Sequence, residues 1–165
     1  MSELLNLQPE SRQLQSATIM AISIDGQVFY LPQVDLITFE NTQQLVEPEQ
    51  QGLSVASIKI GAQTIPVYCL SNDFELLNHI PDERKVCIIT GFRDKRFGIL
   101  CDKIQKLSYS EIRLEPIPAC MNTQSTPLSS LFLYRGQSGV SEMGMMLRNQ
   151  SLFHYLHDMQ EDKAA

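Results

Sequence analysis

Two histidines near the C-terminus have the spacing of residues that can share a metal ion. His154 and His157 stand at positions i and i+3, and Asp158 follows directly. On one helical face two imidazoles can ligate zinc, but a zinc site needs a third ligand. Apolar residues recur at helical spacing in the same stretch. We therefore expect the histidines on the opposite, solvent-facing side, and no metal site.

Cysteine thiols are the second group with reactive chemistry. Cys69, Cys87, Cys101 and Cys120 are widely spaced, with no C-x-x-C motif, and three of them lie within apolar, strand-like runs. A metal or disulfide framework usually has closely spaced cysteines. The pattern favours buried free thiols in a reducing cytoplasm.

Three aspartates, Asp25, Asp94 and Asp102, stand at or near expected turns. Turn chemistry explains Asp25 and Asp94. Asp102 directly follows an apolar strand, where it can bond local backbone or mark a strand bend. The chain has no G-x-S-x-G, P-loop or H-E-x-x-H motif. We expect no catalytic residue and no cofactor, and a protein that acts by binding.

Length and charge narrow the class further. The 165 residues suffice for one ordinary domain or two small subdomains with a shared core. The formal net charge is −6, and the longest basic cluster is Arg93-Asp-Lys-Arg96, so we expect no nucleic-acid surface. No apolar run approaches the roughly 20 residues of a membrane span. A secretory signal peptide begins with basic residues before its apolar stretch, whereas this N-terminus has Glu3 and no basic residue before its first leucines. We therefore expect a cytoplasmic protein.

A central hairpin organises the expected elements. The runs Val86–Thr90 and Phe97–Cys101 are short and apolar and flank a turn at Gly91-Phe-Arg-Asp-Lys. After Cys101 the strand continues to Leu107 with alternating exposure. Further strands are predicted at Thr18–Ile24, Gln27–Leu31, Val34–Phe39, Val55–Ile60, Thr64–Leu70, Tyr109–Leu114, Ser130–Tyr134 and Met143–Leu147. Asp25-Gly26 is the strongest hairpin signal, because glycine tolerates the positive φ of a type I′ turn.

Helical patterns occur at two places only. A short central helix is predicted to begin at Asn72 or Asp73 and to carry Phe74, Leu77 and Ile80. A terminal helix is predicted with Leu152, Phe153, Leu156 and Met159 on one face, capped by Asn149 or Ser151. Residues 1–16 are expected to form a flexible arm and residues 161–165 a flexible tail. Strands without βαβ alternation predict an all-β barrel architecture with minor helices and no parallel sheet.

Four pieces of the chain, in order, resemble motifs of the CheW-like adaptor family of bacterial chemotaxis-type signalling. Ile24–Ile37 is similar to the family's opening hairpin with "y-a-l-P, then V", and Thr64–Phe74 to "i-i-P-V-v-d-L". Arg96–Leu107 is similar to "g-l-l-V-D-x-V-x-x-V", and Ile112–Pro118 to "i-x-p-l-P". The resemblance covers roughly residues 18–158.

The resemblance implies two packed five-stranded antiparallel β-barrels within residues 17–160, around a third apolar core. It implies a non-enzymatic adaptor that couples a chemoreceptor's cytoplasmic tip to the regulatory domain of a CheA-like histidine kinase. The partner-binding residues expected at or beside the motifs are Val34, Leu36, Ile60, Gly61, Ala62 and Tyr68. For these positions the alternative is core packing, or turn geometry in the case of Gly61 and Ala62.

The sequence departs from the family pattern at three places. The Arg-Gly pair that often precedes the "P-V" strand is Gly61-Ala62, the Asp of "v-d-L" is Cys69, and the last strand ends in Arg148 instead of Asp. This divergence suggests an adaptor of a chemosensory system that controls type IV pilus twitching motility. An unrelated small-ligand or metal-binding barrel remains the alternative, and the acidic charge disfavours an oligonucleotide-binding barrel.

Overall fold

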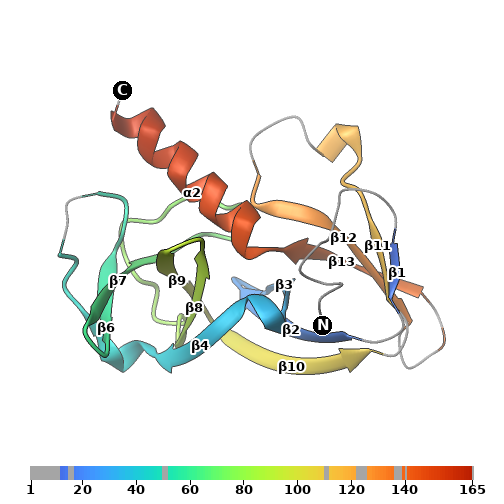
Figure 1. The fold of residues 1–165 in the computed structure, drawn as a ribbon, viewed down its shortest axis with the longest axis horizontal. Coiled ribbons are helices and arrows are strands. Elements are labelled where there is room, and N and C mark those ends of the chain that lie inside the picture. Colours follow the sequence, from blue (N-terminus) through green and yellow to red (C-terminus); the bar gives the residue numbers. More distant parts are fainter. Residues whose placement is uncertain are drawn as a thin grey trace.

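The computed structural model describes residues 12–14, 17–49, 52–109, 112–121, 126–135, 139 and 141–164. Their strands form two curled sheets that lie side by side, with one α-helix, α2 (Asn149–Ala164), across them (Figure 1). The first sheet contains, in spatial order, β1 (Arg12–Leu14), β11 (Ile112–Glu115), β12 (Leu128–Arg135), β13 (Ser141–Leu147), β3 (Gln27–Pro32), β2 (Ala17–Ile24) and β10 (Lys103–Tyr109). The second contains β4 (Leu36–Asn41), β8 (Val86–Phe92), β9 (Lys95–Cys101), β7 (Gln63–Tyr68), β6 (Ala56–Ile60) and β5 (Leu45–Val46). The described residues also form three short 3-10 helices, η1 (Gln33–Asp35), η2 (Thr42–Gln44) and η3 (Ala119–Met121).

Each sheet curls into a barrel because its outer strands are consecutive in the chain. In the second sheet β4 and β5 stand at opposite ends of the strand order, and only η2 separates them in sequence. In the first sheet, with β1 set aside, β10 and β11 have the same relation, and Tyr109 on β10 lies 4.8 Å from the Tyr134 ring of β12. With each consecutive pair counted as one bent strand, both barrels have five strands, which confirms the expected architecture.

Parallel pairing occurs at one seam of each barrel. β13 pairs with β3 at Met145↔Phe29, and β7 pairs with β9 at Val67↔Gly98. Neither sheet is a parallel sheet, as expected, but the expectation of wholly antiparallel barrels fails at these two seams. An alternating strand pattern is the same in either direction, so it does not reveal which distant strand closes a barrel.

The apolar side chains form three cores. One fills each barrel, and the third lies between the barrels and under α2. The shared core takes Ile22 and Phe29 from the first barrel and Ile88 and Ile99 from the second. Leu152, Tyr155 and Leu156 of α2 complete it, so the helix binds both barrels.

The predicted central helix is absent from the described residues 72–80, and that prediction was wrong. Leu70 and Leu76 instead form an antiparallel bridge that closes a short loop. The Ser71 hydroxyl accepts the N–H groups of Asp73 and Glu75, at 3.2 and 3.1 Å, and so satisfies two backbone donors of this loop. Phe74 has a φ of 65°, outside the right-handed helical region, and its ring packs 4.8 Å from Phe29.

The ends of the chain differ from the expected arm and tail. Of residues 1–16 the structure describes only β1, which pairs with β11, and the rest of the expected arm lies outside the described residues. At the other end α2 continues to Ala164 and includes four of the five residues expected to form a tail.

Candidate docking surface

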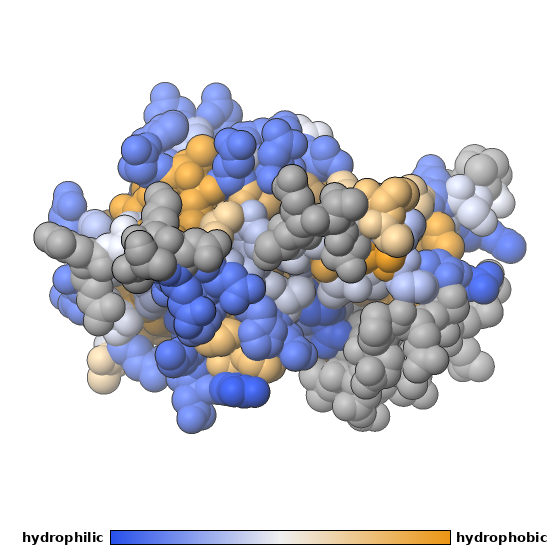
Figure 2. All heavy atoms as spheres, turned by 90° about the horizontal axis from the view of Figure 1, so that it is seen from above, coloured by the Kyte–Doolittle hydropathy of each residue, from blue (hydrophilic) through white to orange (hydrophobic). Residues whose placement is uncertain are grey.

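The strand β4 exposes two apolar side chains, Ile37 and Phe39, which we call the β4 patch. Their exposed fractions are 47% and 51%, and the burial of β4 alternates along its whole length. Other exposed large apolar residues of the described chain are Val28, Val46, Ile80 and Met143. Of this set only Ile37 and Phe39 stand two positions apart on one strand, where side chains project to the same face. Figure 2 shows the molecule from above. On that face the hydrophobic residues form separate patches, with hydrophilic residues between them.

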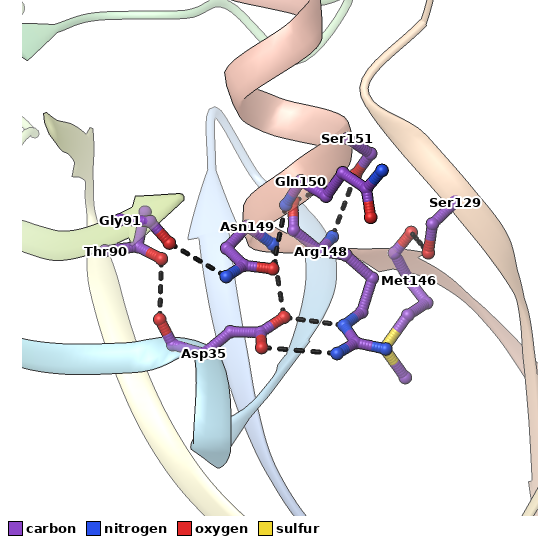
Figure 3. A network of polar contacts seen from close by, with 9 residues as sticks. All are labelled: Asp35, Thr90, Gly91, Ser129, Met146, Arg148, Asn149, Gln150 and Ser151. Carbon is purple, nitrogen blue, oxygen red and sulfur yellow. Dashed lines mark hydrogen bonds and ion pairs between the residues drawn. The ribbon is translucent and has the colours of Figure 1, made fainter. Parts of the chain in front are cut away.

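A buried ion pair fixes the chain where it enters β4 (Figure 3). Asp35 at the end of η1 accepts hydrogen bonds from Arg148 Nε at 2.6 Å and Arg148 Nη2 at 3.3 Å. The Asp35 and Arg148 side chains are only 1% and 11% exposed. The two hydrogen bonds make a bidentate pair between η1 and the start of α2.

Further hydrogen bonds extend this network to β8. The Asn149 backbone N–H donates to Asp35 Oδ2 at 3.1 Å, and the Asn149 side chain donates to the Gly91 carbonyl at 2.8 Å. Thr90 donates its hydroxyl proton to the Asp35 carbonyl at 2.6 Å. The first turn of α2, the end of β8 and η1 are thus held together directly beside the β4 patch.

A second ionic cluster lies at the junction of the two barrels. The Arg84 guanidinium, fully buried, donates from Nη1 to Asp25 at 2.7 Å and to Asp102 at 2.6 Å. Its Nη2 donates to the Leu70 carbonyl at 2.9 Å, and its Nε is the one buried side-chain nitrogen or oxygen without a partner within the described part of the chain. Asp102 Oδ2 also accepts the Asp25 N–H at 2.8 Å.

This second cluster changes the proton affinities of its members. The hydrogen bond from Arg84 is the largest cause that holds the pKa of the Asp25 carboxyl below its usual 3.8. Burial of Arg84 acts to lower the pKa of its guanidinium, but hydrogen bonds to Asp25 and Asp102 outweigh burial and raise it. The cluster is therefore a charged structural clamp, with Asp102 at the passage from β9 to β10.

The sequence-predicted site residues do not lie together. Val34 packs against the first-barrel core and Leu36 against the shared core, while Tyr68 is buried in the shared core and accepts a hydrogen bond from Gln160 at 2.7 Å. Gly61 and Ala62 are exposed at the tip of the β6–β7 hairpin, where Gly61 has a φ of 62°. Ile60 lies beside them, partly buried against the second-barrel core.

The neighbours of Val34 and Leu36 carry the exposed surface that sequence reasoning missed. Residues 33–35 form η1 instead of a strand, and the β4–β8 pairing has an irregularity between Leu36 and Thr38. The even-numbered residues from Val34 to Glu40 are partly buried, and the odd-numbered residues of β4 face solvent. The signal that could have indicated this face is the pair of apolar residues Ile37 and Phe39 two positions apart in the strand.

The histidines of the C-terminal helix do not face one another across a metal site. The His154 ring contacts Phe92, at 5.4 Å between centroids, while His157 lies 3.8 Å from Glu161. The ligand atoms of His157, Asp158 and Glu161 lie within 4.8 Å of one another, but all three residues are exposed. Exposed acidic groups on one helix turn are ordinary surface chemistry.

The four cysteines are free thiols. Cys69, Cys87 and Cys101 are buried, and Cys120 is exposed. Burial raises the pKa of Cys87 and of Cys101 to about 12, so both thiols stay protonated and unreactive. The prediction of buried free thiols is confirmed for these three.

The barrels and the shared core define a two-barrel β protein, with the β4 patch exposed on the second barrel. No protein-family model matches the chain, and no curated protein sequence matches it. Among solved structures, the scaffolding protein TtCheW from Thermoanaerobacter tengcongensis is similar, with a TM-score of 0.57 and 15% sequence identity. The match covers 79% of this chain and 88% of TtCheW. The fold is CheW-like, as the four motifs predicted. No helix within the described ranges is long and apolar enough to cross a membrane.

Proposed function

We propose that this protein is a non-enzymatic, cytoplasmic adaptor that couples a chemoreceptor to a CheA-like histidine kinase. The observation that carries the proposal is the similarity to a scaffolding CheW protein over most of both chains. The regulatory domain of the kinase shares this fold in the family that the sequence motifs resemble. The divergence of the sequence favours a system that controls type IV pilus twitching motility.

In this proposal the β4 patch binds the helical cytoplasmic tip of the receptor. Ile37 and Phe39 stand roughly 7 Å apart along the strand, a spacing that suits one apolar stripe of a helix. The Asp35–Arg148 pair and Asn149 hold the start of β4 in place, so the patch is ordered before the partner arrives. The kinase domain binds elsewhere on the barrels.

The test is direct binding of the full chain to two purified partners encoded in the same genome, a receptor cytoplasmic tip and a kinase regulatory domain. Replacing Phe39 by Ser should weaken binding to the receptor tip about tenfold, because a buried aromatic anchor contributes more than about 1 kcal/mol at such interfaces. Binding to the kinase domain should not change.

Met143→Ser is the matched control, because Met143 is an exposed apolar residue on another barrel, with 62% of its surface accessible. It should leave both affinities as they are. Failure of the wild-type chain to bind either partner would overturn the adaptor proposal. Equal weakening by Phe39→Ser and Met143→Ser would remove the β4 patch from it.

A further inference from the structure

One end of the first barrel is hollow. A cavity of about 550 Å³ opens there between β2, β3, β10, β12 and β13. The cavity adjoins the apolar core of this barrel, because Ala21 and Tyr30 belong to that core and also line the cavity. Ligand pockets are typically about 300–1,000 Å³, so this cavity has room for a small molecule.

Tyrosine rings form one wall of the cavity. Tyr30 and Tyr134 approach each other with their hydroxyl oxygens 3.2 Å apart, and the Tyr109 and Tyr134 ring centroids lie 4.8 Å apart. Tyr109 and Tyr134 are only partly buried, so ring surface remains open. Such flat, amphipathic walls favour a planar aromatic guest.

The position of Tyr30 is fixed from behind by a glycine. Gly144 on β13 lies so close to the Tyr30 ring that a Cβ at this position would clash with it. The absence of that Cβ lets the ring rest on the β13 backbone. The tyrosine wall is thus built into the seam between β13 and β3 and does not depend on a ligand for its place.

Polar groups with unused bonding capacity face the same space. Ser23 lines the cavity with 8% of its surface exposed, and its hydroxyl makes no hydrogen bond to any residue that the structure describes. Lys103 lines it from β10, and it has no carboxylate within ion-pair distance among those residues. Glu142 lines the cavity from β13 and contributes to the raised pKa of the Tyr134 hydroxyl, of which burial is the largest cause. Lys103 is therefore a cation that a bound anion can neutralise.

From these groups we infer that the first barrel binds a small planar aromatic carboxylate. The aromatic part stacks on Tyr109 and Tyr134, and the carboxylate pairs with the Lys103 ammonium group. The Ser23 hydroxyl can donate to the same carboxylate, because Ser23 and Lys103 are paired across β2 and β10. This ligand site is separate from the β4 patch and goes beyond the proposed adaptor function.

The test is calorimetric titration of the full chain with naphthalene-2-carboxylate, and with uncharged naphthalene-2-carboxamide as the matched ligand. The carboxylate should bind saturably with one molecule per chain. Lys103→Gln should weaken carboxylate binding about tenfold, the value of one charge-assisted contact, and leave carboxamide binding unchanged. Tyr109→Leu should weaken binding of both ligands.

Lys106→Gln is the control variant, because Lys106 is exposed on the same strand but does not line the cavity. It should bind both ligands as the wild type does. Absence of saturable binding at millimolar carboxylate would overturn the inference, as would equal weakening by Lys103→Gln and Lys106→Gln. Should Tyr109→Leu fail to fold, the exposed Lys103 variant decides the question alone.

Discussion

Single residues in this protein have partners that lie far away in the chain. Asp25 is the clearest case, because its place in an Asp-Gly turn already explains it, with a φ of 51°. The structure adds an ion pair with Arg84, 59 positions later, and a backbone bond to Asp102. Turn chemistry is local and can be predicted from the sequence. The ion pair depends on how two barrels meet, and no local pattern encodes it.

Asp25→Asn should make stability less dependent on acid pH. The pKa of Asp25 is lowered in the folded state, so its ion pair contributes fully above the unfolded value of 3.8 and is lost as pH falls through the folded pKa. Asn accepts the positive φ of this position, so the turn should persist. Urea midpoints of both proteins should differ by a constant amount above about pH 5, and the difference should shrink towards pH 2.

Asp94→Asn is the control for this experiment, because Asp94 is an exposed turn residue without an ion pair in the described ranges. Its midpoints should follow those of the wild type at every pH. A gap between wild type and Asp25→Asn that is as wide in acid as at neutral pH would show that the variant disturbs the turn and not the ion pair.

At the scale of elements, strands were easier to predict than the connections between them. The alternating runs and the Asp25-Gly26 turn identified the main hairpins, because alternation and turn residues are local signals. The predicted central helix does not form because Phe74 takes a φ of 65° and Leu70 pairs with Leu76 across a short loop. The β4 patch was missed by one residue because Leu36 and Ile37 put apolar side chains on both faces of the strand, and the sequence alone does not tell which face meets solvent.

The buried pair of Asp35 and Arg148 joins η1, β8 and α2, and its loss should be felt across all three elements. Asp35→Asn leaves the Arg148 charge buried without its counter-ion, so the free energy of unfolding should fall by about 3–5 kcal/mol. Urea unfolding followed by circular dichroism measures the change. Arg113→Gln, which removes an ion pair with 59% of the arginine side chain exposed, should cost less than about 1 kcal/mol. Equal losses in the two variants would argue against the network as an anchor.

At the scale of the whole molecule, the shared core makes two barrels into one structure. Phe29 from the first barrel, Phe97 from the second and Leu152 from α2 belong to the same buried cluster. Arg84 adds a charged clamp between the β2–β3 turn and the second barrel. The family motifs predicted this architecture. Local patterns could not have done so, because the core between the barrels comes from segments more than 100 positions apart.

One consequence is that the two barrels should unfold together. Tyr30, Tyr109 and Tyr134 line one end of the first barrel, so tyrosine fluorescence reports largely on that barrel. Cys87 is a probe of the second-barrel core, where burial raises the pKa of its thiol to about 12 and prevents alkylation while the barrel is folded. In a urea series the fluorescence change and Cys87 alkylation should have the same midpoint, because neither barrel can unfold without exposing the shared core.

Cys120 is already exposed in the folded protein, so it should react at every urea concentration. If Cys87 reacted at lower urea than the tyrosine transition, the second barrel would open by itself, and the shared core would be an interface between two independent units.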